Sequence, residues 1–162
     1  MPLITLFSAP KPFSDAHIAT IQRNAIRSWT LLPDVEVLLL GDETGLAAAA
    51  RDLAVRHLAD VARNPNGTPL ISSLFESARA HGRGDLLCIV NADIILMPDF
   101  VEAARKVRLQ RDTFVLLSQR WDVDIKGPLD FSDGWKNRLL SIVRSRGTLH
   151  RPAGSDFFLF PR

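Results

Sequence analysis

The stretch from Leu86 to Phe100, LLCIVNADIILMPDF, constrains the fold of this chain more than any other. Its first five residues are all apolar, which is typical of a strand that is buried on both faces at the centre of a mainly parallel sheet. Asn91-Ala92-Asp93 interrupts the apolar run, and Pro98-Asp99 then marks the start of a helix. The stretch therefore predicts a central strand, a polar turn and a helix in succession.

Apolar runs and helical spacings alternate along the rest of the chain. They predict strands at 3–7, 35–40, 58–62, 86–90, 113–118 and 157–160, and helices at about 14–32, 44–57, 70–80, 99–109 and 135–145. Such alternation indicates βαβ units with right-handed crossovers. We therefore expect one α/β domain over residues 1–162, with three layers and a mainly parallel sheet flanked by helices. Residues 1–120 form its regular βα core and residues 121–162 an irregular C-terminal segment.

Composition excludes several classes of protein. A net charge of +2 and three scattered tryptophans do not indicate nucleic-acid binding. The single cysteine, Cys88, lies in the most apolar strand and is expected to be a buried hydrophobe. No apolar run approaches the roughly 20 residues of a membrane span, and no signal peptide is evident. We expect a cytoplasmic protein, with peripheral contact at the inner membrane face as an option.

Polar residues follow three of the predicted strands. They are the loop Ser8–Lys11, then Asp42, and then Asn91 with Asp93. In a parallel sheet these strand ends share one edge, where open α/β sheets bind their ligands. The chain has neither the glycine pattern of dinucleotide-binding folds nor that of P-loop proteins. A phosphate-bearing ligand would therefore need a divalent cation, and Asp93 is the candidate metal ligand.

Asn91-Ala92-Asp93 after an apolar strand resembles the Asp-x-Asp motif of GT-A-fold glycosyltransferases, which use nucleotide sugars. Four further patches are similar to a less-studied group of such enzymes, and they span nearly the whole chain: ITLFSAPKPF, AIRSW, MPDF and GSDFFLF. Members of this fold commonly continue beyond the point that corresponds to Arg162. The resemblance therefore implies a GT-A-like chain without the usual C-terminal portion.

The resemblance also implies roles for particular residues. Asp93 would contact a Mn²⁺ or Mg²⁺ ion and the diphosphate, and Asn91, which replaces the motif's first acid, would orient the ribose or a metal-bound water. Arg120 and Asp156 would face the sugar or the acceptor, and Asp156 is the candidate catalytic residue. The residues expected to line the nucleotide pocket are Ser8, Ala9, Pro10, Lys11 and Asp42.

Other polar residues have simpler interpretations. Asp122 and Asp124 form a second Asp-x-Asp, but they follow Trp121 in a polar segment and are expected to be solvated loop acids. The four histidines have no metal-type spacing, so each is expected at the surface or a helix end. His150 is the one of them near the candidate site.

The sequence thus predicts a glycosyltransferase, or its nucleotide-binding half, that moves a sugar from a nucleoside diphosphate to an acceptor hydroxyl. One alternative is a catalytically degenerate interaction module that uses the basic segment 135–151 to contact a partner or a membrane surface. Another is a nucleotidyltransferase, although that class carries a glycine-rich basic loop after the first strand. Here Ser8–Pro12 supplies only Lys11.

Overall fold

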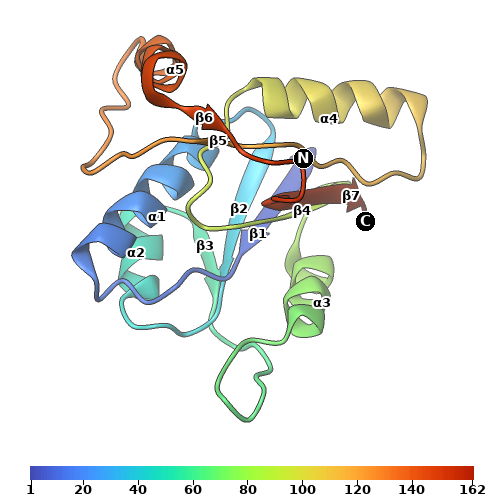
Figure 1. The fold of residues 1–162 in the computed structure, drawn as a ribbon. Coiled ribbons are helices and arrows are strands. Elements are labelled where there is room, and N and C mark those ends of the chain that lie inside the picture. Colours follow the sequence, from blue (N-terminus) through green and yellow to red (C-terminus); the bar gives the residue numbers. More distant parts are fainter.

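The computed structural model describes all residues from Met1 to Arg162. Its main sheet has five strands in the order β3-β2-β1-β4-β7, and β1 to β4 are parallel (Figure 1). β7 pairs antiparallel with β4, from Leu86 opposite Pro161 to Val90 opposite Phe157. The strands are β1 (Ile4–Ser8), β2 (Val35–Leu40), β3 (Arg56–Leu58), β4 (Leu86–Val90), β5 (Trp121–Asp122), β6 (Thr148–Leu149) and β7 (Phe157–Pro161).

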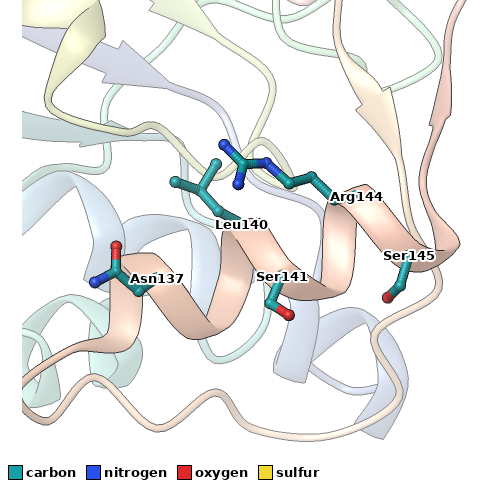
Figure 2. A pocket seen from close by; sticks show the side chains of 5 residues that line it. All are labelled: Asn137, Leu140, Ser141, Arg144 and Ser145. Carbon is teal, nitrogen blue, oxygen red and sulfur yellow. The ribbon is translucent and has the colours of Figure 1, made fainter.

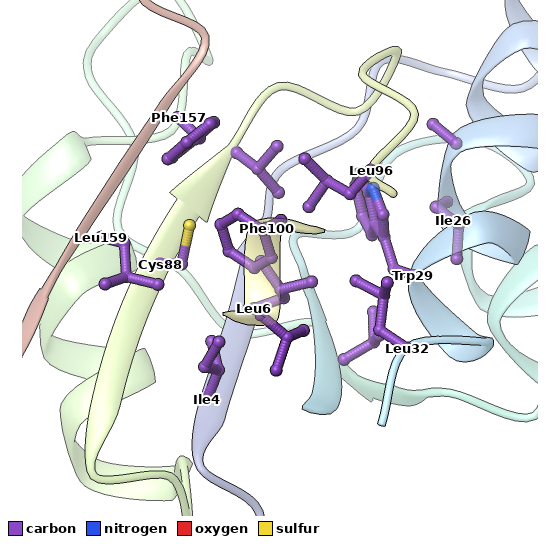
Figure 3. Packing of buried hydrophobic residues seen from close by; sticks show 14 of the residues in the cluster. Ile4, Leu6, Ile26, Trp29, Leu32, Cys88, Leu96, Phe100, Phe157 and Leu159 are labelled. Carbon is purple, nitrogen blue, oxygen red and sulfur yellow. The ribbon is translucent and has the colours of Figure 1, made fainter. Parts of the chain in front are cut away.

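Helices cover both faces of this sheet. These are α1 (Ala16–Thr30), α2 (Leu46–Asp52), α3 (Ile71–His81) and α4 (Asp99–Gln110). The fifth helix, α5 (Trp135–Arg146), contributes to neither apolar cluster on the sheet. On one face, α1, α2 and α4 enclose the larger apolar cluster around Leu6, Trp29 and Phe100 (Figure 3). On the other face, α3 packs Leu74 and Ala78 over a smaller cluster. The three-layer, mainly parallel α/β architecture is therefore confirmed.

β4 lies at the centre of the apolar interior, as its sequence predicts. Leu86, Leu87 and Cys88 are fully buried, and burial raises the pKa of the Cys88 thiol well above its ordinary value. Trp29 on α1 is also fully buried, and its indole N–H donates to the carbonyl of Ile94 at 2.8 Å. That bond fixes the turn after β4 against α1.

Three predicted elements differ from the structure. The third strand, expected at 58–62, lies instead at Arg56–Leu58, where it pairs with the end of β2. Thr113–Ser118 is not a strand of the main sheet, because β7 occupies the place beside β4, and Leu116 makes only an isolated bridge to Leu159. The second helix is shorter than expected. It begins after Gly45 (φ +82°) and ends before Ala54 (φ +54°), both in the left-handed region, which breaks a helix.

Apart from β7, which belongs to the main sheet, the C-terminal segment is tied to the core through few contacts. The buried amide of Asn24 donates to the carbonyl of Gly127 at 3.0 Å and accepts from the Leu129 N–H at 2.9 Å. β5 and β6 form a separate two-stranded ribbon, in which Trp121 lies opposite Leu149. No helix of the structure has the length and apolar character that crossing a membrane requires.

Candidate functional site

A cleft of about 950 Å³ opens beside the turn that follows β4. Residues of this turn, the segment 116–125, α5 and α1 contribute to its lining. Five acids and two arginines line the cleft: Asp93, Asp99, Asp122, Asp124, Asp156, Arg120 and Arg144. In the strand order, β4 and β2 lie on opposite sides of β1, so the direction of winding reverses beside β4. The carboxyl ends of strands at such a reversal are where open α/β sheets bind ligands.

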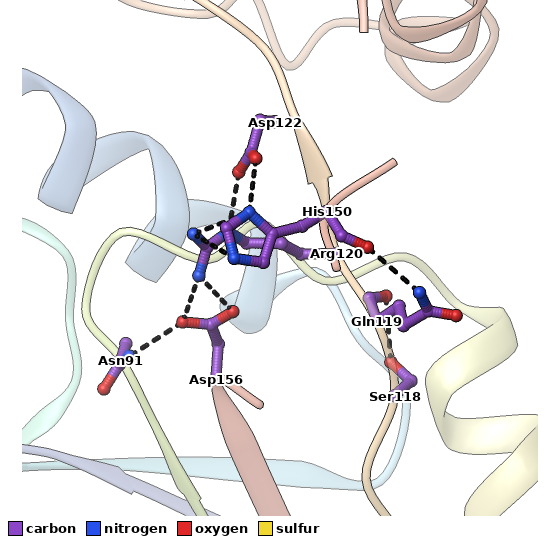
Figure 4. A network of polar contacts seen from close by, with 7 residues as sticks. All are labelled: Asn91, Ser118, Gln119, Arg120, Asp122, His150 and Asp156. Carbon is purple, nitrogen blue, oxygen red and sulfur yellow. Dashed lines mark hydrogen bonds and ion pairs between the residues drawn. The ribbon is translucent and has the colours of Figure 1, made fainter. Parts of the chain in front are cut away.

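Asp156, immediately before β7, is the centre of a polar network (Figure 4). The Nη1 of Arg120 donates to both carboxylate oxygens of Asp156, at 2.7 and 2.6 Å. The Nδ2 of Asn91 donates to Asp156 Oδ1 at 3.0 Å, and the Asn91 backbone N–H donates to the Asp156 carbonyl at 2.9 Å. The Asp156 side chain is only 10% exposed. Three residues expected at the site from sequence thus lie in direct contact.

Asp122 and His150 extend this network. The Nε of Arg120 donates to Asp122 Oδ1 at 2.6 Å, and His150 Nδ1 lies 2.6 Å from Asp122 Oδ2. The hydrogen bonds that Asp122 makes with Arg120 and then with His150 lower the pKa of Asp122. The hydrogen bonds that Arg120 donates to Asp156 and then to Asp122 raise the pKa of Arg120. A Cβ at Gly154 would lie 2.3 Å from the His150 ring, so glycine permits the ring to pack there.

The expectations for Asp122 and His150 were incomplete. Asp122 was expected to be a solvated loop acid and His150 a surface histidine, but both contact Arg120. The sequence signal was weak because the pairing depends on β5 lying antiparallel to β6, with Asp122 opposite Thr148. Neither two-residue strand has an apolar pattern that would predict it.

Asp93 lines the cleft and is exposed. Its carboxylate takes part in none of the ion pairs of the structure. The structure contains no group of three histidine, cysteine, aspartate or glutamate side chains that could hold a metal ion. Asp93 is thus a single free carboxylate, and a cation bound there would need further oxygen ligands from a substrate or water.

The loop Ser8–Lys11 lies outside the lining of this cleft. The Ser8 side chain is 1% exposed, and its hydroxyl donates to the carbonyl of Val90 at 2.6 Å, which joins the ends of β1 and β4. Pro10 is buried and Ala9 is half-buried. The backbone of Lys11 exchanges two hydrogen bonds with the buried side chain of Gln22, at 2.7 and 3.0 Å, so α1 fixes the loop while the Lys11 side chain stays exposed.

Asp42 follows β2 and also lies outside the cleft lining. Its side chain is 67% exposed and pairs with Arg63. Arg63 Nη2 also donates to Glu43 Oε1 at 2.8 Å, whereas Glu43 Oε2 is buried and has no hydrogen-bond donor. A second polar cluster therefore occupies the sheet edge beyond β2, separate from the network around Asp156.

The sequence matches no protein-family model and no curated protein. The structure, however, is similar to several solved proteins. One is a mannosyltransferase from Pyrobaculum calidifontis in complex with GDP-Man and Mn²⁺, with a TM-score of 0.58 and 17% identity, over 99% of this chain and 45% of the other. Another is glucosyl-3-phosphoglycerate synthase from Mycobacterium tuberculosis, with a TM-score of 0.55 and 17% identity, over 99% and 56%.

A third similar structure is 4-diphosphocytidyl-2C-methyl-D-erythritol synthase from Anaerococcus prevotii, with a TM-score of 0.51 and 9% identity, over 99% of this chain and 70% of the other. The chain thus spans about half the length of the two glycosyl-transferring enzymes. Identities this low establish the fold and not the activity. The chain has the GT-A-like, Rossmann-like α/β fold of nucleotide-diphospho-sugar transferases.

Proposed function

We propose that this chain binds a nucleoside-diphosphate sugar with a divalent cation and contributes to transfer of the sugar to an acceptor hydroxyl. The observation that carries the proposal is the position of Asp93. Its unpaired carboxylate lines a 950 Å³ cleft at the carboxyl edge of the central strand. The fold supports the same class of ligand, because the similar mannosyltransferase was solved with GDP-Man and Mn²⁺.

A cation at Asp93 would take its remaining ligands from the substrate and from water. Mg²⁺ is usually held by one or two carboxylates together with substrate phosphates and several waters. Asp93 would supply the carboxylate, and the cation would offset the charge on the departing diphosphate. The amide of Asn91 already donates to Asp156, so its proposed part is to position that carboxylate rather than to bind the metal.

The loop Ser8–Lys11 and Asp42 are proposed to lie beside the nucleoside. Ser8 would hold the loop in place without touching the ligand, since its buried hydroxyl binds the carbonyl of Val90 and joins β1 to β4. The exposed side chain of Lys11 and the 67%-exposed carboxylate of Asp42 are available for direct contact. Contact with Asp42 would compete with its ion pair to Arg63.

Asp156 and Arg120 are proposed to face the transferred sugar or the acceptor. Oδ1 of Asp156 already accepts from Asn91 and Arg120, whereas Oδ2 accepts only from Arg120 and retains acceptor capacity for a hydroxyl. A general base must lie within hydrogen-bond reach of the proton that it accepts. Asp156 is our candidate for this role, because it lines the cleft and Arg120 holds its orientation.

Thermal unfolding with UDP and GDP, each with and without Mn²⁺, tests the proposal. A ligand that binds only the folded state raises the midpoint by mass action. We expect a Mn²⁺-dependent increase that Asp93→Asn abolishes. The matched control is Asp85→Asn, which removes an exposed carboxylate from the opposite end of β4 and should keep the increase. The same midpoint with every nucleotide–metal pair would contradict nucleotide-sugar binding.

A nucleotidyltransferase is the second candidate, because one of the similar structures is 4-diphosphocytidyl-2C-methyl-D-erythritol synthase. Such an enzyme would join a sugar phosphate to the α-phosphate of a nucleoside triphosphate and release diphosphate. The loop after β1 lacks the glycine-rich basic sequence expected for that reaction, since Lys11 is its only cation. Diphosphate release from CTP or UTP with a sugar phosphate would favour it over the glycosyltransferase proposal.

A further inference from the structure

The two arginines that line the cleft differ in their contacts. Arg120 donates to Asp156 and Asp122 and lies beside His150, so most of its donors are engaged. Arg144 on α5 takes part in none of the ion pairs of the structure. The cleft thus contains one guanidinium without a carboxylate partner. That guanidinium is available to an anionic ligand.

Arg144 also lines a second hollow of about 470 Å³ on the surface of α5 (Figure 2). The other residues of this hollow are Asn137, Leu140, Ser141 and Ser145, which the 3.6-residue helical period places along one side of α5. Leu140 belongs to both hollows as well, and its side chain projects from the same side of the helix as Arg144. Arg144 therefore stands where the cleft meets the surface.

The charges carried by α5 itself favour a negative ligand, although the rest of the cleft lining is acidic. The helix carries Lys136, Arg138, Arg144 and Arg146 and no acid. Arg138 is engaged by Asp130 and by the carbonyl of Asp133, so it is not free for the cleft. An arginine fork matches phosphate oxygens in charge and in geometry. Next to Arg144, Leu140 and Val143 give the cleft an apolar wall.

We propose that Arg144 binds a phosphate group on the acceptor, so that the acceptor enters along α5 with its phosphate on Arg144 and its hydroxyl toward Asp156. This inference rests on the proposed glycosyl transfer, because it names the acceptor class for that same cleft. Asp93 and Arg144 then divide the cleft between a cation-bound diphosphate and the anionic group of the acceptor. The phosphate could belong to a soluble metabolite or to a lipid headgroup, and both present the same chemistry.

A titration of ¹⁵N-labelled protein with glycerol 3-phosphate, with glycerol as the neutral control, tests the site. We expect shifts at Arg144, Ser141 and the Trp121 indole with the phosphate only. Arg144→Gln should weaken binding about tenfold, in line with the loss of a charge-assisted hydrogen bond. Arg146→Gln is the matched control, because it removes the same charge two residues further along α5. The Arg146 side chain lines neither hollow. Equal weakening by both variants, or no binding by the wild type in solution or on vesicles, would overturn the site.

Sedimentation with vesicles separates the two sources of phosphate. Vesicles of phosphatidylcholine with and without phosphatidylglycerol are the probes. Binding that needs phosphatidylglycerol and Arg144 would assign the acceptor phosphate to a lipid, whereas binding of glycerol 3-phosphate alone would assign it to a soluble molecule. Either result supports the site, provided that Arg146→Gln behaves as the wild type.

The nucleotide experiment keeps this inference distinguishable from the proposed function. Arg144→Gln should leave the Mn²⁺-dependent midpoint increase with nucleotide unchanged, because Arg144 is proposed to contact only the acceptor. If phosphate binds through Arg144 while no nucleotide binds, the glycosyltransferase proposal fails and a phosphate-binding site remains. If nucleotide binds and phosphate does not, only the assignment of the acceptor fails.

Discussion

The part of the chain up to β4 and the segment after α4 are held in place by different forces. β1 is buried along its whole length, and β2 and β4 are nearly so, with apolar clusters on both faces of the sheet. After α4 only a few side chains are buried, and Trp121 and Leu149 are exposed. Its last strand, β7, pairs with β4 in the main sheet, and the rest of this later segment depends on Asn24, on the Leu116–Leu159 bridge and on the ion pairs of Arg120.

The cleft lies between these two parts and takes its walls from both. Asp93 is positioned by the apolar part, through β4 and the indole of Trp29. Asp156 is positioned mainly by charge, through Arg120 of the later segment, and is also held by Asn91 at the end of β4. The two candidate acids should therefore respond to different perturbations, with Asp93 sensitive to packing and Asp156 sensitive to charge.

The largest expected effect contrasts two tryptophans, one from each part. Trp29→Ala should lower the free energy of unfolding by about 3–5 kcal/mol, because it empties a fully buried site. Trp121→Ala should change it by no more than about 0.5 kcal/mol, because Trp121 is 53% exposed. Denaturant unfolding monitored by circular dichroism measures both. Similar losses for the two variants would remove the distinction between the parts.

A smaller and more local effect is expected for Arg120→Met. It leaves the 10%-exposed carboxylate of Asp156 without its cationic partner, at a cost on the order of 1–3 kcal/mol. Amide hydrogen exchange should accelerate in β5, β6 and at the start of β7, and remain slow in β1. Arg138→Met is the control, since its pair with Asp130 is exposed and should matter little. Uniform acceleration across the sheet would show that the network is not local.

Much of the fold could be predicted from sequence because continuous apolar runs leave few alternatives. β1, β2 and β4 lie, within one residue, where the runs Leu3–Phe7, Val35–Leu40 and Leu86–Val90 predict them. The prediction of a strand at Thr113–Ser118 is wrong, and the reason lies in pairing between distant parts of the chain. β7 pairs with β4 instead, so Val115 and Leu117 remain exposed.

The candidate site could be predicted only in part. Asn91, Arg120 and Asp156 do come together, and Asp93 shares their cleft. Nothing in the local sequence brings Asp122 to His150, because a two-residue ribbon joins them across 28 positions. The expected closeness of Asp42 to this group is not seen at the cleft, since Asp42 pairs with Arg63 beyond β2.

The smallest expected effect is a change in hydrogen exchange at low pH. The pKa of Asp122 is held below its ordinary value of 3.8 by Arg120 and His150, so its ionised form stabilises the folded segment. That contribution is complete above the ordinary value and is lost as the pH falls through the lowered one. Hydrogen exchange of β5 and β6 should therefore accelerate in this acidic range, and Asp122→Asn should remove most of that dependence.

Glu36 provides the counterpart within the apolar part. Burial raises the pKa of Glu36, but hydrogen bonds from Thr5, the Arg83 backbone and Arg56 outweigh it and lower the pKa overall. Protonation of Glu36 should therefore reduce global stability over an acidic range of its own, and Asp122→Asn should leave that loss unchanged. If Asp122→Asn altered the pH dependence of global unfolding as much as that of local exchange, charge in the C-terminal segment would be coupled to the whole sheet. Asp93 and Asp156 would then not be expected to respond independently, and the division of the molecule into a part held by packing and a part held by charge would have to be abandoned.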